Sequence, residues 1–183
     1  MWRLLVLLAL LTALPGGLAA GEFYVGVGIG EKAAGGQFSQ PLREFGVEAS
    51  DQGHKAFVGA EISELLALEG TYYDFGTRTC CPGLADAGFV TDLNAFSAAL
   101  VGRFPMEQVE FFAKAGALFW QEKGEEITIA GPRQLSAEGS DMVFGAGVWW
   151  RIAGKFSLGA EWEALEVGGD SISGLWLNAR IGF

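Results

Sequence analysis

The chain has 183 residues, half of them hydrophobic and 19 % charged, and its net charge is −10. This length is enough for one domain with a substantial core. An acidic chain lacks the basic face that binding to phosphates needs, so a nucleic-acid-binding role is excluded. One histidine and two cysteines also exclude most metal sites and most nucleophilic catalytic groups.

The first twenty residues differ in character from the rest of the chain. Arg3 supplies a positive charge, residues 4–14 form an apolar run, and small residues follow at Ala19–Ala20. The run is too short for a transmembrane helix. The pattern predicts a secretory signal peptide over residues 1–20, cleaved beside one of the two alanines, and a mature domain over residues 21–183.

Beyond the signal peptide, apolar and mixed positions alternate with period two, which is typical of β-strands. The first strand is expected at residues 22–30, where Phe, Val and Ile share one face and Tyr and Gly the other. Residues 31–54 lose the alternation and are expected to form a long loop. Strands are then expected at residues 55–62 and 66–75, joined by a tight turn.

The middle of the chain repeats this arrangement. Residues 76–91 are expected to form a second long loop. Strands are expected at residues 92–104 and 109–121, with a turn at 105–108 between them. A third, polar loop is expected at 122–141.

Three strands are expected in the last part of the chain. The first two, residues 142–152 and 156–167, are joined by a turn. A short loop at 168–171 leads to the final strand, residues 173–183, which has one wholly apolar face and ends on an aromatic residue.

Eight strands with alternating short and long connections are expected in an antiparallel up-and-down barrel, because alternate connections lie at opposite ends. Short turns at one end and long loops at the other are typical of outer-membrane barrels. We therefore predict an all-β fold, an eight-stranded antiparallel up-and-down transmembrane β-barrel preceded by a signal peptide.

The two faces of the predicted strands differ in charge. The apolar face carries no charge, and the opposite face combines glycines with four acidic and four basic residues. Small residues and balanced charges suit the crowded interior of an eight-stranded barrel, so the apolar face is expected to meet lipid. A soluble exported β-barrel, with the faces reversed, is the alternative. The predicted lumen charges are Glu61, Glu69, Arg103, Lys114, Arg151, Glu161, Glu163 and Arg180.

These lumen charges admit two interpretations. An internal salt-bridge network that fills the barrel is favoured, because eight strands leave little open lumen. A narrow polar path or gate is the alternative. Arg180 is expected to pair with an acid among Glu61, Glu69, Glu161 and Glu163.

Aromatic residues of the apolar face are expected to form two girdles, as in membrane barrels. One girdle lies near the short turns and the other near the long loops. The first comprises Phe23, Phe104, Phe111, Phe156 and Phe183, and the second Tyr72, Phe96, Phe119 and Phe144.

Segments 56–76, 96–105, 112–120 and 144–163, together with the terminal strand, resemble the OmpA-like family of eight-stranded outer-membrane β-barrels. The resemblance implies that the alternating strand ending at Ile181 and Phe183 is an assembly signal, which the barrel-assembly machinery reads. No second, periplasmic domain is expected after Phe183, so the peptidoglycan binding of two-domain relatives is not carried over.

Two further groups of residues are candidate sites. Cys80 and Cys81 lie in a predicted exported loop, where an intermolecular bridge, a vicinal disulfide and two free thiols all remain open. His54 follows Ser50 and Asp51, a combination that a lipid-modifying hydrolase or acyltransferase would need. A solvated loop histidine is the favoured interpretation.

The predicted function is that of an integral outer-membrane barrel in a Gram-negative envelope, with a structural or surface-interaction role such as membrane integrity or loop-mediated adhesion. A narrow pore for small solutes is the alternative, and a lipid-modifying enzyme is less favoured. No cofactor is expected. The expected partners are outer-membrane lipids including lipopolysaccharide, periplasmic chaperones, the barrel-assembly machinery and an extracellular ligand bound by the loops.

Overall fold

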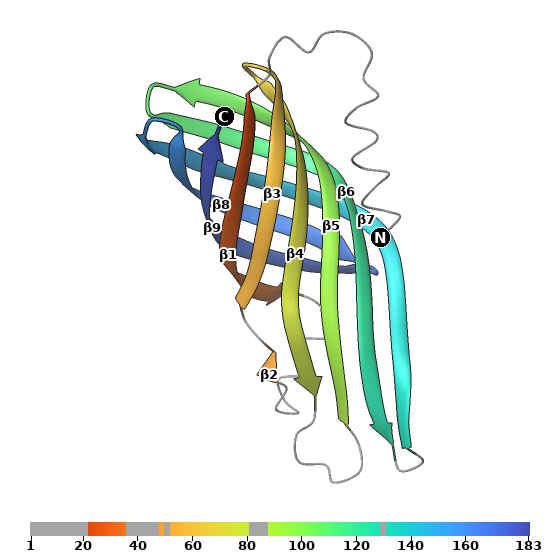
Figure 1. The fold of residues 1–183 in the computed structure, drawn as a ribbon. Coiled ribbons are helices and arrows are strands. Elements are labelled where there is room, and N and C mark those ends of the chain that lie inside the picture. Colours follow the sequence, from red (N-terminus) through yellow and green to blue (C-terminus); the bar gives the residue numbers. More distant parts are fainter. Residues whose placement is uncertain (1–21, 36–47, 50–51, 81–87, 129–130) are drawn as a thin grey trace.

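The computed structural model describes residues 22–35, 48–49, 52–80, 88–128 and 131–183 (Figure 1). Nine strands occupy these ranges: β1 Phe23–Gly35, β2 Glu48–Ala49, β3 Gln52–Ser63, β4 Leu66–Cys80, β5 Gly88–Met106, β6 Val109–Thr128, β7 Gly131–Ala153, β8 Phe156–Val167 and β9 Asp170–Gly182. Within them, no helix has the length and hydrophobicity that crossing a bilayer requires. The predicted signal peptide lies outside the described residues.

Eight of the strands form a closed antiparallel barrel, as the sequence predicted. Each long strand pairs with its neighbours in chain order. The sheet runs from β4 through β3, β1, β9, β8, β7 and β6 to β5, and the β4–β5 pairing closes it into a ring. The first and last strands close the barrel, with β1 paired to β9 from Tyr24–Gly182 to Gly35–Ser171. The short β2 pairs only with β4, beside the barrel.

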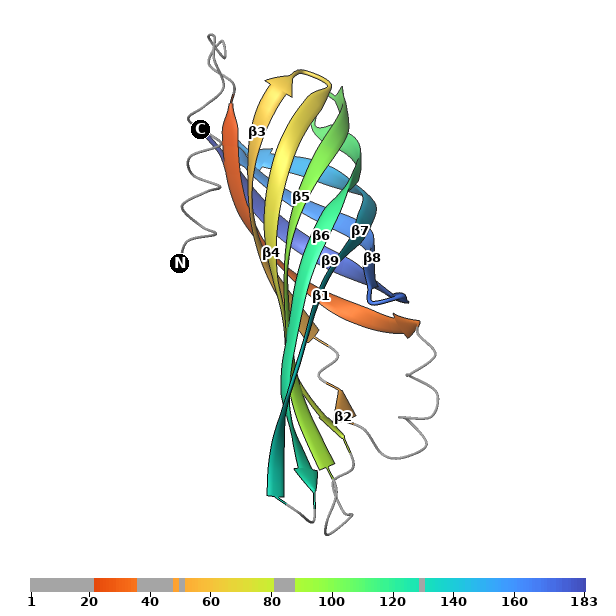
Figure 2. The same ribbon diagram turned by 90° about the vertical axis from the view of Figure 1, so that its right-hand side faces the viewer.

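The two ends of the barrel differ in shape. Tight turns at 64–65, 107–108 and 154–155 lie at one end, called here the turn end. The C-terminus lies at this end too, where the Phe183 amide donates a 2.8 Å hydrogen bond to the Phe23 carbonyl (Figure 1). At the other end β4 to β7 project past the remaining strands as a twisted sheet (Figure 2).

Several predicted loops are wrong in extent, because the strands continue into them. Residues 122–141 were expected to form a loop, yet β6 and β7 stay paired out to Thr128 and Gly131. Beyond the barrel both faces of a strand meet water, so polar residues occupy both faces and the alternation disappears. Backbone hydrogen bonding does not need that alternation, and the strands therefore continue.

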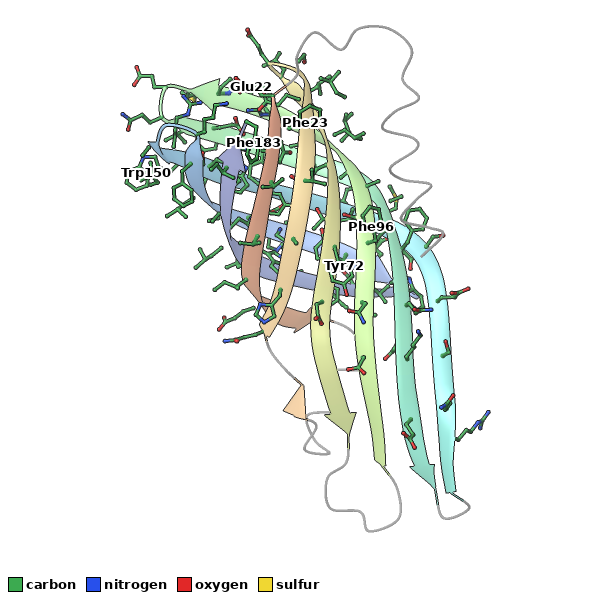
Figure 3. All side chains as sticks on the ribbon, viewed as in Figure 1. Glu22, Phe23, Tyr72, Phe96, Trp150 and Phe183 are labelled. Atoms are coloured by element: carbon green, nitrogen blue, oxygen red, sulfur yellow. The ribbon has the colours of Figure 1, made fainter. Side chains whose placement is uncertain are left out.

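The outward face is apolar and the interior face is buried, as predicted for a lipid-facing barrel. Val27, Leu100 and Leu177 are among the exposed outward residues, and Tyr24, Phe112 and Trp176 are buried inside. Outward aromatic residues lie in two bands. Figure 3 shows Phe23, Trp150 and Phe183 near the turn end and Tyr72 and Phe96 farther along the barrel.

Candidate functional site

Five charged side chains meet in the middle of the interior, and we call them the central cluster. The Lys114 Nζ atom lies 3.0 Å from Glu69, 2.7 Å from Glu161 and 2.6 Å from Glu163. The Lys55 Nζ atom lies 2.5 Å from Glu161 and 3.0 Å from Glu163. They come from β3, β4, β6 and β8 and meet because period-two alternation turns each of them inward.

Neutral side chains also donate hydrogen bonds to the three central carboxylates. The Tyr24 hydroxyl donates to Glu69 at 3.0 Å, and the Tyr73 hydroxyl donates to Glu163 at 2.9 Å. The Asn178 amide donates to Glu161 at 2.8 Å. Buried charges cost stability unless they are paired and hydrogen-bonded, so these donors help to keep the cluster in the interior.

A second set of charges, the rim cluster, lies nearer the turn end. The Arg103 guanidinium bridges Glu61 and Glu110, each at 2.5 Å. Arg180 donates to the other oxygen of Glu110 at 2.9 Å. Its guanidinium also stacks on Trp149, with 4.3 Å between the Arg180 Cζ atom and the ring centroid.

Apolar layers separate and cover these clusters. On the side of the turn end, a layer of buried side chains includes Tyr24, Phe57, Phe112 and Trp149. On the opposite side, the layer comprises Tyr73, Phe75, Leu93, Ala95, Leu118, Val143, Leu165 and Trp176. The described interior is therefore filled by alternating polar and apolar layers.

The predicted lumen residues behave differently from one another. The structure brings seven of the eight into the two clusters, and Arg151 is the exception. Its side chain is exposed at the turn end and forms no ion pair with another described residue. Strand β7 ends two residues later, so a side chain on the inward face at this position reaches water and not the filled interior.

The pairing of Arg180 also differs from the expectation. Its partner is Glu110, which was not among the four acids considered. Lys55 and Glu110 were both missed as network members. On the predicted strands, Lys55 falls on the same face as Glu61, and Glu110 falls on the same face as Lys114. This alternation could have identified both as interior residues. Both, however, lie at or next to the first residue of their predicted strands.

The extension is the sheet in which β4 to β7 run on past β8 and β9: residues 74–80, 88–95, 120–128 and 131–139. At its base, Phe75, Leu93 and Ala95 still belong to the apolar layer of the barrel interior. Strand β7 pairs with β6 from Gly131 onward, but with β8 only from Val143. Residues 132–140 of β7 therefore face no second strand among the described residues, and one edge of the extension is open.

The charged side chains described in the extension are mostly acidic, with five acids and two bases. The acids are Asp74, Asp92, Glu122, Glu125 and Glu138, and the bases are Lys123 and Arg133. At its base, Asp141 accepts hydrogen bonds from the Trp120 indole at 2.7 Å and the Gly168 amide at 2.8 Å. These bonds tie β6 and β7 to the β8–β9 turn.

The remaining sequence candidates are placed as follows. His54 lies in β3, not in a loop, with an exposed side chain directly across from Asp74 of β4. Ser50, Asp51 and Cys81 lie outside the described residues, and Cys80 ends β4. Among the described residues, no group of His, Cys, Asp or Glu side chains is arranged to hold a metal ion.

Three solved structures with the same fold are distant in sequence. The Yersinia pestis attachment invasion locus protein Ail, in complex with the heparin analogue sucrose octasulfate, is similar at 16 % identity and a TM-score of 0.60, with 89 % of this chain and 99 % of that chain covered. The N-terminal β-barrel domain of Pseudomonas aeruginosa OprF gives 12 % identity, a TM-score of 0.57 and the same coverage.

A third structure, the outer membrane protein OprG from Pseudomonas aeruginosa, gives 10 % identity and a TM-score of 0.59, covering 89 % of this chain and 94 % of that one. A comparison with curated proteins finds no match. Residues 4–180, however, match the family described as outer membrane protein beta-barrel domain. The chain therefore belongs to the outer-membrane β-barrel protein family.

Proposed function

We propose that this outer-membrane barrel acts at the cell surface by binding an extended polypeptide along the open edge of β7. The observation that carries this proposal is the difference between the two pairings of β7. Nine residues, 132–140, pair with β6 on one side and face no described strand on the other. An open edge of this kind is a template for adding a strand from a partner.

The orientation of the barrel supports a surface role. Short turns face the periplasm in outer-membrane barrels, and longer segments face the outside. The turn end of this barrel is then periplasmic and the extension is extracellular. Because the extension projects past the barrel strands β8 and β9 (Figure 2), a partner could reach its edge from solution.

The charge of the extension sets the class of partner. Ail was crystallised with a heparin analogue, which is a polyanion. In this chain the charged side chains described in the extension are five acids and two bases, so a polyanion would be repelled. A neutral or basic polypeptide fits the charge, and main-chain pairing supplies the affinity.

Transport through the lumen fits the observations less well. The interior holds two apolar layers and a paired charge cluster, and each layer would have to move for solutes to pass. We therefore favour surface binding over a pore, and outer-membrane lipids including lipopolysaccharide are the proposed contacts of the outward apolar face. Chaperones and the assembly machinery remain proposed partners during export.

We also infer that the protein is not an enzyme. His54 lies beside Asp74, the acid that would have to orient it in a catalytic group. The Asp74 carboxylate, however, already accepts a 2.9 Å hydrogen bond from the Gly76 amide. His54→Ala should leave lipid A acyl chains in isolated membranes unchanged relative to wild type. Loss of acyl-chain release or transfer in that variant would establish the enzymatic alternative.

Shortening the β6–β7 hairpin tests surface binding. Deleting residues 123–136 and joining the ends with Asn-Gly keeps the register, because Glu122 and Ala137 already face each other. Bacteria that display this variant should lose attachment to cell monolayers and to immobilised extracellular matrix protein. Heat-modifiable gel migration should show an equally folded barrel. Full attachment by the folded variant would refute the proposal.

Proline at residues 136 and 137 provides a matched pair of variants. Amides of successive strand residues point to opposite sides, so one variant removes a donor of the open edge and the other a bond to β6. If the edge is used, the open-edge variant should lose attachment while its hairpin stays paired. If only the variant that breaks a bond to β6 loses attachment, the partner recognises side chains of the hairpin and not its open edge.

A further inference from the structure

The turn end of the barrel, which the proposed orientation places in the periplasm, contains a depression that the proposed surface binding does not use. Its lining includes Trp149, Arg151, Ser157, Arg180, Glu107 and Glu110. Three of these residues lie side by side on adjacent strands, because Ser157 of β8 is the direct partner of Arg151 on β7 and of Arg180 on β9. Ser157 is thus flanked by an arginine on each neighbouring strand.

Several hydrogen-bond donors in this depression have no acceptor among the described residues. Ser157 is only 6 % exposed, and its hydroxyl makes no hydrogen bond to a described residue. Arg151 has no ion pair among the described residues. Arg180 uses only its Nη2 atom for Glu110, which leaves its Nε and Nη1 donors without a described acceptor.

The nearby carboxylates do not cancel this excess of donors. Glu110 is shared between Arg103 and Arg180, and Glu61 is paired with Arg103, so the rim cluster is balanced in charge. Arg151 is an additional base. Glu107 sits exposed on the 107–108 turn with a φ of 49° and is the one lining carboxylate outside that cluster.

We propose that this depression is an anion site, in which Arg151, Ser157 and the free donors of Arg180 bind one oxyanion group of a soluble periplasmic molecule. Planar guanidinium groups match carboxylate and phosphate oxygens, and charge-assisted hydrogen bonds are the strong ones. Trp149, Ser157 and Arg180 face the barrel interior, so the site opens to the aqueous mouth and not to lipid. Carboxylate and phosphate are the two possible sources of the group.

Titration of the full-length barrel, folded in lipid nanodiscs, tests the proposal. Succinate and inorganic phosphate are added separately, and backbone amide shifts of Arg151, Ser157 and Arg180 are followed by NMR. At least one anion should saturate these shifts, with a dissociation constant on the order of 1 mM, as expected for two charge-assisted hydrogen bonds. The anion that saturates identifies the source, and no saturation with either would overturn the site.

Variants separate a built site from general positive charge. Arg151→Gln and Ser157→Ala should each weaken binding, the first by about tenfold, as the loss of one charged hydrogen bond implies. Lys155→Gln is the matched control, because it removes the same charge from the neighbouring turn without touching the depression. Equal weakening by Lys155→Gln and Arg151→Gln would reduce the effect to diffuse attraction and refute the site.

Glu107→Gln provides a test in the opposite direction. Removing the lining carboxylate outside the rim cluster should tighten anion binding or leave it unchanged, and weaker binding would contradict the assigned lining. Heat-modifiable migration confirms that each variant is folded. The site lies at the opposite end of the barrel from the extension, so its outcome is independent of the proposed surface binding.

Discussion

The ring of Tyr24 lies over Gly59, its direct partner on the neighbouring strand, in the space that a side chain at residue 59 would fill. A Cβ atom at residue 59 would stand 2.0 Å from the Tyr24 Cζ atom, a distance that real contacts do not show. Interior glycines thus make room for the rings that fill the barrel. The same relationship holds in the register pairs Phe57–Gly26, Phe112–Gly147, Trp149–Gly159 and Trp176–Gly30.

Gly59→Ala should therefore destabilise the barrel. The added methyl group displaces the Tyr24 ring and its hydrogen bond to Glu69, and such overpacking costs about 1–3 kcal/mol of unfolding free energy. Gly102→Ala is the control, because the nearest atom to its Cβ is 3.8 Å away. Urea unfolding in lipid vesicles, followed by gel migration, measures both. Equal stabilities of the two variants would contradict this account of the glycines.

The central cluster should respond unequally to the loss of a base and of an acid. It holds two lysines and three glutamates. Lys114→Met leaves three carboxylates with one lysine, and breaking a buried pair in this way costs about 3–5 kcal/mol. Glu163→Gln leaves two acids and two bases and should cost less.

Vesicle unfolding in urea also decides this second prediction. The difference between the Lys114→Met and Glu163→Gln variants is the informative quantity, because both remove one charge from the same cluster. A larger loss for Glu163→Gln would mean that hydrogen bonding to its carboxylate, and not the charge balance, controls stability.

The barrel should conduct little or no steady current. Paired charges and two apolar layers occupy the lumen. The described side chains, in the positions they hold, therefore already close the barrel. Recordings of the purified protein in planar bilayers measure this directly. Large and stable channels, reproduced with independent preparations, would favour the pore.

Removing Phe183 should impair membrane insertion more than shortening the β6–β7 hairpin does. The Phe183 amide bonds the Phe23 carbonyl where the first and last strands meet, and its side chain is exposed on the outward face. The deletion removes both that bond and the terminal aromatic of the closing strand. Levels of heat-modifiable protein in outer-membrane fractions provide the comparison, and normal levels for the deletion would argue against it.

The sequence by itself determined the barrel and the direction of its faces. Period-two alternation identifies strands wherever one face meets lipid and the other a crowded interior, so the strand that contains Leu175 and Leu177 could be oriented from the chain alone. The same reasoning turned Glu161 and Glu163 inward. It failed at residues 122–141, where water on both faces of the β6–β7 hairpin removes the signal.

Only the tertiary structure decided which charges meet. Pairing across the lumen depends on the stagger of the strands, which alternation does not encode, so Arg180 could be turned inward but not matched to Glu110. The open edge of β7 has the same origin, because it arises where β8 ends and β7 continues. The Arg151–Ser157–Arg180 row likewise exists only through the register of three adjacent strands.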